Sequence, residues 1–279
     1  MMERASVFAD GLDHPECVIT HPDGTLWAGG EAGQIYRISE DGSNVEEVAN
    51  TGGFILGIAF NKGAEWMAIC DLGKHCMWKL NMKDLKLELL AEEVPGHKFN
   101  IPNYAVFDEV GNLYVSESGE FRQKKGKIIE FDPAGKGQVW TDELFEFANG
   151  MAMEKGEKHL YVVSSFLPGI ERVAINADGT AGEREVYCTL PRTVPDGISF
   201  DDEENLYVSC YTPNKIYKVT PDRNVTEYLF DWDGHTLSNP TNTAWGGENF
   251  DQMFTANLGR WHITKIDMGV KGLKLVSHR

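Results

Sequence analysis

Four oxygen-bearing side chains occupy one phase of a repeated pattern in this chain of 279 residues. Each repeat has a small or apolar segment that opens a strand, and about ten residues later a motif such as Leu-Tyr-Val-Ser. At four of the six openings the same position carries a carboxylate or a carboxamide, and these residues are Glu16, Asn103, Asn149 and Asp196. Repetition explains the apolar frame, but not a matched set of oxygen ligands, which indicates a functional site.

The register of the repeats predicts the fold. Successive equivalent positions are 40 to 47 residues apart, and they fall at Glu16, Leu56, Asn103, Asn149, Asp196 and Asn242. Repeats of this length with several short strands each are typical of a β-propeller, so we expect an all-β, six-bladed propeller. The segment from Ala5 to Leu12 resembles the fourth strand of a repeat. We expect it to pair with the C-terminal blade, which would close the ring and remove open sheet edges. No linker interrupts the repeats, so residues 1–279 are predicted to form a single domain.

Repeat phase brings the oxygen ligands together. In a propeller the first strand of each blade lines the central channel, so residues of equal phase face one another across its axis. Two carboxylates in a medium of low dielectric constant repel each other unless a cation neutralises them. Oxygen ligands suit a hard divalent cation, most naturally Ca²⁺, with Mg²⁺ or Mn²⁺ as alternatives. Zn²⁺ could also enter but prefers nitrogen or sulfur ligands.

Each of these positions taken singly has an ordinary structural interpretation. Asn149-Gly150 could be a hairpin turn, and Pro195-Asp196-Gly197 is a common turn sequence. Proline precedes three of the four positions, which suits a rigid, extended entry into the inner strand. It is their shared phase that favours a metal site.

Composition excludes several function classes. With 26 basic and 43 acidic residues the formal net charge is −17, which argues against nucleic acid and anionic membranes as partners. No apolar stretch approaches the length of a membrane span, and the first residues lack the features of a secretory signal. The five cysteines have no metal-ligand spacing; Cys70 and Cys76 could approach each other, but free thiols are favoured. A cytoplasmic location fits best, and oligomeric state is not readable.

The chain resembles the gluconolactonase, regucalcin and luciferin-regenerating enzyme family of six-bladed propellers with a divalent cation in the channel. The resemblance spans nearly the whole chain, and its most specific segments are Pro15-Glu16, Asn149-Gly150, Pro195-Asp196-Gly197 and residues 240–247. It implies that Glu16, Asn149 and Asp196 bind the metal. Asn103 would be a fourth ligand or a substrate contact. The related diisopropyl fluorophosphatase uses a comparable set of ligands.

The resemblance also implies a reaction, the hydrolysis of a lactone. The cation would polarise the ring carbonyl and stabilise the oxyanion. Asp196 would take a proton from the attacking water, although a bound cation lowers the basicity of a carboxylate. Direct nucleophilic attack by Asp196 is the less favoured variant. A phosphotriesterase-like hydrolase on the same metal and a non-catalytic calcium-binding propeller are the alternatives.

Two departures from the family pattern bear on the substrate, a small lactone or ester. Sugar-lactone members often carry an arginine and an aspartate around the third-blade asparagine, where this chain has Ile101 and Tyr104. The pocket is therefore expected to suit an apolar or aromatic substrate better than a polyol, with Asn103, Tyr104 and Arg122 as substrate contacts. Arg122 could hold a carboxylate, although a solvated loop arginine is the commoner case. Other residues that could line the channel opening are Phe121, Phe166, His235 and Trp261.

Overall fold

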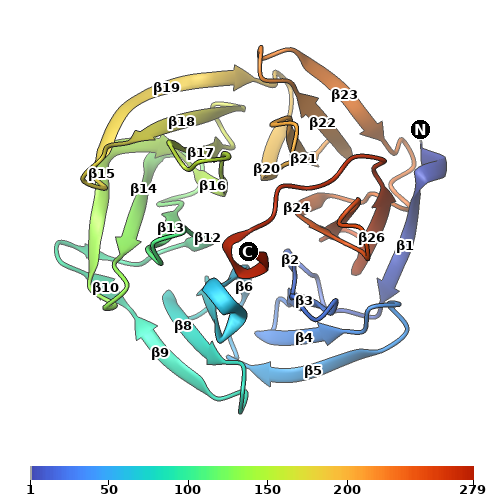
Figure 1. Cartoon of the computed structure of the whole chain (residues 1–279), viewed down its shortest axis with the longest axis horizontal. Helices are drawn as coiled ribbons and strands as arrows, with labels where there is room; N and C mark the ends of the chain where they lie inside the picture. Colours follow the sequence, from blue (N-terminus) through green and yellow to red (C-terminus); the bar gives the residue numbers. More distant parts are fainter. Residues whose placement is uncertain (1) are drawn as a thin grey trace.

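The computed structural model describes residues 2–279, apart from the side chain of Asp142. Six antiparallel sheets of four strands each are arranged around a central axis (Figure 1). This confirms the predicted all-β, six-bladed propeller. The helical content of the described residues is three single 3₁₀ turns: η1 (Met2–Arg4), η2 (Lys62–Ala64) and η3 (Val276–His278). None of these is long and apolar enough to cross a membrane.

The first three blades follow the chain from the inner to the outer strand. Blade 1 contains β2 (Cys17–Thr20), β3 (Leu26–Gly29), β4 (Gln34–Ile38) and β5 (Val45–Asn50). Blade 2 contains β6 (Ile55–Phe60), β7 (Trp66–Asp71), β8 (Cys76–Asn81) and β9 (Leu87–Ala91). Blade 3 contains β12 (Pro102–Phe107), β13 (Leu113–Glu117), β14 (Lys124–Phe131) and β15 (Gly137–Glu146). A small hairpin of β10 (Glu93–Val94) and β11 (His97–Lys98) joins blades 2 and 3.

The last three blades repeat this order, and the final one takes its outer strand from the N-terminus. Blade 4 contains β16 (Ala148–Met153), β17 (His159–Ser164), β18 (Gly169–Ile175) and β19 (Ala181–Thr189). Blade 5 contains β20 (Val194–Phe200), β21 (Leu206–Thr212), β22 (Lys215–Val219) and β23 (Val225–Phe230). Blade 6 contains β24 (Pro240–Gly246), β25 (Gln252–Asn257), β26 (His262–Asp267) and β1 (Ala5–Asp10).

The ring closes as the sequence predicts. Strand β1 pairs antiparallel with β26, from Ala5 opposite Ile266 to Asp10 opposite His262. Closure gives blade 6 the same four strands as the others, so no sheet lacks its outer strand.

The hydrophobic core lies between neighbouring blades. Side chains of β6, β16 and β24 are buried along the whole strand, whereas outer strands such as β5 are partly exposed. The motif tyrosines Tyr114 and Tyr207 are among the largest fully buried side chains. All five cysteines are buried and free, which confirms the prediction of free thiols and excludes a bond between Cys70 and Cys76.

All six inner strands run in the same sense along the channel. We call the end where they begin, next to the phase positions of the sequence, the mouth, and the other end the far end. After β26 the C-terminal segment, residues 268–279, crosses the middle of the ring (Figure 1). It packs against the far ends of the inner strands, where Leu273 N donates to Phe200 O (2.9 Å) and Val276 is buried in the core. The sequence patterns did not predict this cover.

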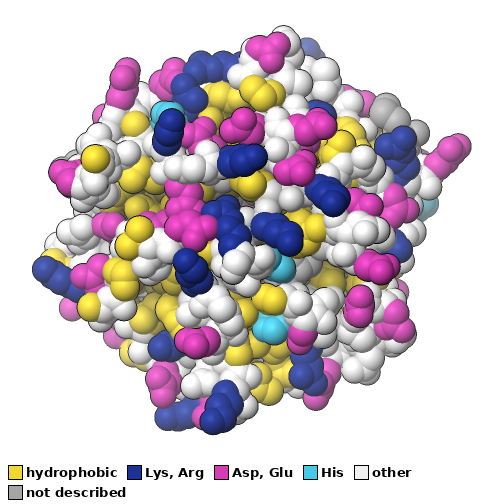
Figure 2. Space-filling model, viewed as in Figure 1, with side chains coloured by type: hydrophobic (Ala, Val, Ile, Leu, Met, Phe, Trp, Pro, Cys, Tyr) yellow, Lys and Arg dark blue, Asp and Glu magenta, His cyan; other side chains and the backbone are white. Residues whose placement is uncertain are grey.

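Figure 2, in the same view, shows acidic and basic side chains interspersed over the surface, with several lysine and arginine side chains near its middle. The C-terminal segment forms two ion pairs through Arg279. Its Nη1 lies 2.5 Å from Glu109 Oε1 and 3.2 Å from Glu157 Oε1. These contacts tie the segment to blades 3 and 4.

Candidate metal centre

The inner strands share a local irregularity at the phase positions. Regular pairing with the second strand of the blade breaks at these positions in five of the six blades. The breaks lie at Leu56 in β6, Asn103 in β12, Asn149 in β16, Asp196 in β20 and Asn242 in β24. In blade 1, β2 begins directly after Glu16. A bulge of this kind leaves a residue outside the regular strand pairing and redirects its side chain. The residues at the phase positions are therefore displaced from regular pairing in a similar way.

Glycines allow the inner strands to approach closely at this level. Gly57, Gly150 and Gly197 each follow a phase position. An added Cβ would lie 2.3 Å from Asn103 O at Gly57 and 2.4 Å from Asp196 O at Gly150. Backbone atoms of neighbouring blades therefore meet where any side chain would clash, and the ring is narrow at the mouth.

Hydroxyl groups fix the backbone around the candidate ligands. Ser165 Oγ donates to Pro195 O (2.8 Å), just before Asp196, and accepts from Asn149 Nδ2 (3.2 Å). Thr241 Oγ1 donates to Glu16 O (2.7 Å), and Ser118 Oγ donates to Ala148 O (2.6 Å). The three bonds to backbone carbonyls each join one blade to the next, whereas the Asn149–Ser165 bond lies within blade 4. Ser118, Ser165 and Thr241 thus hold the backbone around the candidate ligands.

Glu16 and Asp196 interact electrostatically across the channel. Burial, followed by the negative charges of Asp196 and Glu31, raises the pKa of Glu16 well above its usual value, and a hydrogen bond with Thr241 opposes this only in part. Burial also raises the pKa of Asp196 to about 7, against a hydrogen bond from the Asn149 amide. Both side chains keep some exposure to the channel. Repulsion and desolvation thus disfavour two negative charges here.

A divalent cation fits this arrangement. Glu16 Oε2 is buried and has no hydrogen-bond partner among the described residues. Nearby stand a second carboxylate, from Asp196, and the Asn149 carboxamide. A hard cation would satisfy the free oxygen and remove the repulsion between the two acids.

The other predicted site residues have clear places. Asn103 is 7% exposed, and none of the hydrogen bonds among the described residues uses its side chain. Tyr104 reaches towards blade 6, where its hydroxyl donates to Asn242 Oδ1 (3.4 Å). Burial raises the pKa of Tyr104, and the Asp196 charge adds to this rise, so the phenol stays protonated beside the acids.

Asn242 was aligned in the register but was not chosen as a candidate. It is 3% exposed and occupies the same bulge position as the other oxygen ligands. The register alone could have found it, because Asn242 is a fifth oxygen-bearing side chain of equal phase, in the sixth repeat, and faces the same channel.

The predicted mouth residues fall into different environments. The Arg122 guanidinium carbon lies 5.3 Å from the Phe121 ring centre and 5.9 Å from that of Phe166. His235 is exposed. His262 is buried, with Nε2 2.9 Å from Thr236 O, so its contacts are structural.

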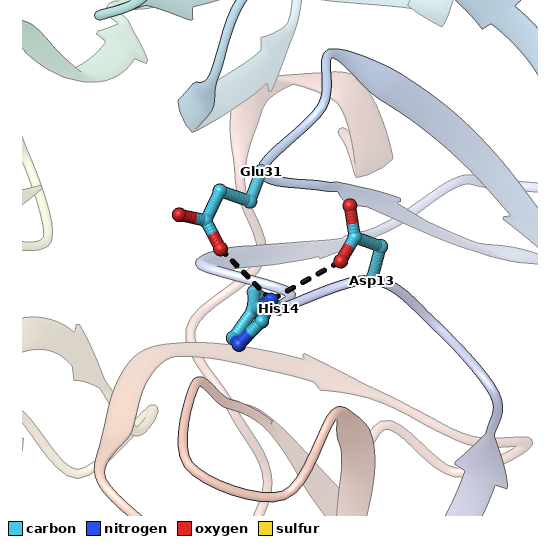
Figure 3. A group of neighbouring side chains, drawn as sticks. All are labelled: Asp13, His14 and Glu31. Atoms are coloured by element: carbon cyan, nitrogen blue, oxygen red, sulfur yellow. Dashed lines mark hydrogen bonds and ion pairs between the residues drawn. The ribbon is translucent and has the colours of Figure 1, made fainter.

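A second group at the mouth was not predicted from the sequence. Figure 3 shows His14 between Asp13 and Glu31, with Nδ1 2.8 Å from Glu31 Oε2 and 3.1 Å from Asp13 Oδ1. The His14 ring packs against Trp261 at 4.3 Å between ring centres. Burial tends to raise the pKa of Asp13, but hydrogen bonds with Gln34 and His14 outweigh it and lower the pKa. Ligand atoms of the three residues lie within 4.8 Å of one another. The sequence does not predict this group, because the group depends on the conformation of the folded loop. In that loop His14 has a left-handed φ of 38°.

The family can now be assigned by comparison with known proteins. The family model described as "SMP-30/Gluconolactonase/LRE-like region" matches residues 14–257. The chain belongs to this family. The match covers five complete blades and the two inner strands of the sixth, β24 and β25, and it confirms the resemblance predicted from the sequence motifs.

The curated relatives of this chain are distant. Strictosidine synthase-like protein 6 of Arabidopsis thaliana is 27% identical over 71% of this chain and 56% of its own length. A gluconolactonase of Zymomonas mobilis is 25% identical over 63% of this chain and 54% of its own length. The chain thus spans little more than half the length of these curated relatives.

Solved structures of the family share the fold. A gluconolactonase from Xanthomonas campestris superposes with a TM-score of 0.81 at 18% identity, covering 95% of this chain and 89% of that one. Regucalcin from Agrobacterium tumefaciens, described as a calcium-binding protein, has a TM-score of 0.78 at 17% identity, covering 98% and 96%. At this level of identity the likeness establishes the propeller architecture.

For this member of the gluconolactonase-like family, the raised pKa of Asp196 predicts a pH-dependent stability. The folded, metal-free protein retains a proton on Asp196 up to about pH 7, whereas the unfolded chain releases it near 3.8. The free energy of unfolding should therefore fall as the pH rises from about 4 to about 7, with a limiting slope of about 1.4 kcal/mol per pH unit from this group.

The measurement is chemical unfolding in chelator at several pH values, with Asp196→Asn as the comparison. The difference between the two proteins isolates this group from His278, whose pKa burial lowers to about 4 and whose effect has the opposite sign. If the free energy of unfolding changed with pH in the same way for both proteins, the raised pKa of Asp196 would be contradicted.

Proposed function

We propose that this chain is a divalent-metal-dependent hydrolase that opens a small lactone. The observation that carries this proposal is the pair of partly buried acids at the mouth: the buried Glu16 Oε2 has no hydrogen-bond partner among the described residues, and Asp196 lies next to a carboxamide. Membership of the gluconolactonase-like family and the activities named for relatives, such as the Zymomonas gluconolactonase, support it.

Glu16, Asn149 and Asp196 would hold the cation, with Asn103 as a fourth ligand or a substrate contact. Ca²⁺ is the most natural choice for an all-oxygen set, and the calcium-binding description of the Agrobacterium neighbour agrees with it. When bound, the cation would supply Lewis-acid polarisation of the lactone carbonyl.

Asp196 would take the proton of the attacking water. Burial raises the pKa of Asp196 to about 7 in the metal-free protein, and a bound cation would lower it, so that the carboxylate is ionised and able to accept a proton at neutral pH. The Asn149 amide orients this carboxylate, and Ser165 in turn holds the Asn149 amide. These two contacts fix the direction in which the base points.

Tyr104 would shape the substrate side of the site. Its ring reaches from blade 3 towards Asn242 in blade 6 and also lines the apolar interior of the channel beneath the mouth. An aromatic ring in this place favours an apolar or aromatic lactone over a polyol. Arg122 stands above at the rim, where it could pair with a substrate carboxylate.

The proposal is tested with a panel of lactones in a pH-drop assay, with and without a chelator. We expect hydrolysis to be lost in EDTA and restored by Ca²⁺, Mg²⁺ or Mn²⁺. Activity that survives complete metal removal would overturn metal dependence. Turnover of phosphotriesters but not lactones would select the phosphotriesterase-like alternative. Ca²⁺ binding without turnover of either class would select a non-catalytic calcium-binding propeller.

A further inference from the structure

Exposed aromatic side chains gather at one end of the propeller. Among the described residues, four aromatic side chains are exposed: Phe121, Tyr211, Trp232 and Trp261. The strand registers place all four at the mouth. Each lies at or just after the C-terminal end of β13, β21, β23 or β25, and these strand ends lie at the mouth. Exposed large hydrophobic residues at the far end, such as Val110, Val225 and Leu275, are aliphatic. The mouth is therefore selectively aromatic.

Three phenylalanine rings form a built cluster within this rim. The Phe121 ring lies edge-on to Phe166 at 5.0 Å and to Phe147 at 5.9 Å, and Phe147 is 5.4 Å from Phe166. The mutual packing holds Phe121 in place although it is 65% exposed. A fixed, exposed aromatic surface loses little entropy when a ligand packs on it.

Arg122 completes this surface. Its guanidinium lies over the rings of Phe121 and Phe166, and it makes no ion pair or hydrogen bond in the described part of the chain. The neighbouring Glu120 is already paired with Lys125. The arginine donors therefore remain free, in a position set by the rings beneath them. We call Phe121, Arg122, Phe147 and Phe166 the aromatic shelf.

The shelf adjoins the oxygen cluster directly. Phe147 lies two residues before Asn149 and has a left-handed φ of 67°. Phe166 follows Ser165, whose hydroxyl holds the Asn149 amide. In addition, Ser165 N donates to Phe147 O at 3.2 Å. A ligand whose reacting carbonyl sits at the acids would thus place a substituent over the shelf.

We infer that the aromatic shelf binds the substituent of the substrate, and that this substituent is a flat aromatic group bearing a carboxylate. The inference rests on the proposed lactone hydrolysis and names its substrate class. The phenylalanine rings supply the flat apolar surface, and Arg122 supplies a bidentate partner for the acid group. In a protein with a net charge of −17, a free arginine at the mouth also offsets the repulsion of an anionic substrate.

The test compares γ-butyrolactone with its γ-phenyl and γ-(para-carboxyphenyl) derivatives. We expect the wild-type protein to prefer the carboxyphenyl compound in kcat/KM. Phe121→Ala should lower the preference for both aryl compounds over the unsubstituted lactone about tenfold. Arg122→Gln should lower kcat/KM about tenfold more for the carboxyphenyl than for the phenyl compound. Phe121 suits truncation because it is mostly exposed.

Trp232→Ala is the matched control, because Trp232 is an 81% exposed aromatic at the same end that packs on Phe230 and not on the shelf. It should leave the preference for aryl compounds unchanged. The shelf would be overturned if wild type and Phe121→Ala had the same preference for aryl compounds. It would also be overturned if Trp232→Ala lost this preference as much as Phe121→Ala.

Equilibrium binding separates this failure from a failure of the proposed function. The probe is a cyclopentanone with the same para-carboxyphenyl group, which cannot be hydrolysed, titrated by calorimetry into wild type and both shelf variants. One informative outcome is that the wild-type protein opens no lactone and yet binds this ketone about tenfold more tightly than Phe121→Ala does. That result would overturn the proposed hydrolase function and support the shelf. Identical binding by wild type and both variants would overturn the shelf whatever the activity.

Discussion

Replacing Asp196 by asparagine should reduce kcat/KM for lactone hydrolysis about a thousandfold. Asparagine has nearly the same shape and keeps one oxygen towards the cation, but it cannot accept a proton from water. The Asn149 amide and the Ser165 hydroxyl should still hold the side chain in place. The variant should therefore fold normally and lose its activity mainly in kcat.

The measurement is steady-state hydrolysis together with calorimetric titration of Ca²⁺. Asp233→Asn is the control, because Asp233 is an exposed carboxylate in the loop after β23, at the same end of the propeller. It should retain wild-type rates. Activity of Asp196→Asn within tenfold of wild type would place the base elsewhere.

Turnover in H₂¹⁸O distinguishes the base from a nucleophile. If Asp196 only accepts a proton, the peptide that contains it gains no heavy oxygen after many turnovers. If its carboxylate attacks the lactone carbonyl, the ring alkoxide leaves and a mixed anhydride forms. Water that then attacks the Asp196 carbonyl of this anhydride leaves heavy oxygen on the side chain. Incorporation at Asp196 would therefore replace the base assignment with covalent catalysis.

The second large effect concerns Glu16, whose replacement by glutamine should abolish the response of stability to Ca²⁺. In the wild-type protein, Ca²⁺ at about 100 times its Kd should stabilise the fold by about 2.7 kcal/mol, a rise in Tm of about 5 to 10 °C. Glu16→Gln removes one of the two charges that attract the cation and should lose most of this rise.

The same substitution should leave the metal-free protein at least as stable as wild type. Because burial and Asp196 raise the pKa of Glu16, its ionisation at high pH opposes folding, and glutamine does not ionise. The measurement is thermal unfolding with and without Ca²⁺, at several pH values from about 7 to about 9. Asp233→Asn is again the control, because Asp233 is an exposed acid at the same end of the propeller and should keep the full Ca²⁺ response. A full Ca²⁺ response in Glu16→Gln would exclude Glu16 as a ligand.

The repeat register carried much of the sequence interpretation. It predicted six blades, the closing strand β1 and a common level for Glu16, Asn103, Asn149 and Asp196. This works because equivalent strands of a propeller occupy equivalent positions about one axis, so phase in the sequence becomes direction in space. The bulges in the inner strands repeat for the same reason.

Contacts between loops of different blades lay beyond the register. The Phe121 cluster and the grouping of His14 with Glu31 join residues of unrelated phase. Their backbone conformations are also irregular, with positive φ at His14, Phe147 and Trp261. Such angles are unfavourable for an isolated residue and persist only where the surrounding fold imposes them, so local sequence could not predict them.

The sequence by itself determined the propeller, its closure and the common phase of the oxygen-bearing side chains, because these depend on a local pattern that is repeated along the chain. The tertiary structure alone decided which oxygen is left without a partner, namely Glu16 Oε2, and how strongly Asp196 is perturbed. It also decided that the C-terminal segment covers the far end and that aromatic side chains gather at the mouth. Burial, charge proximity and loop packing depend on all six blades at once, and no single repeat contains them.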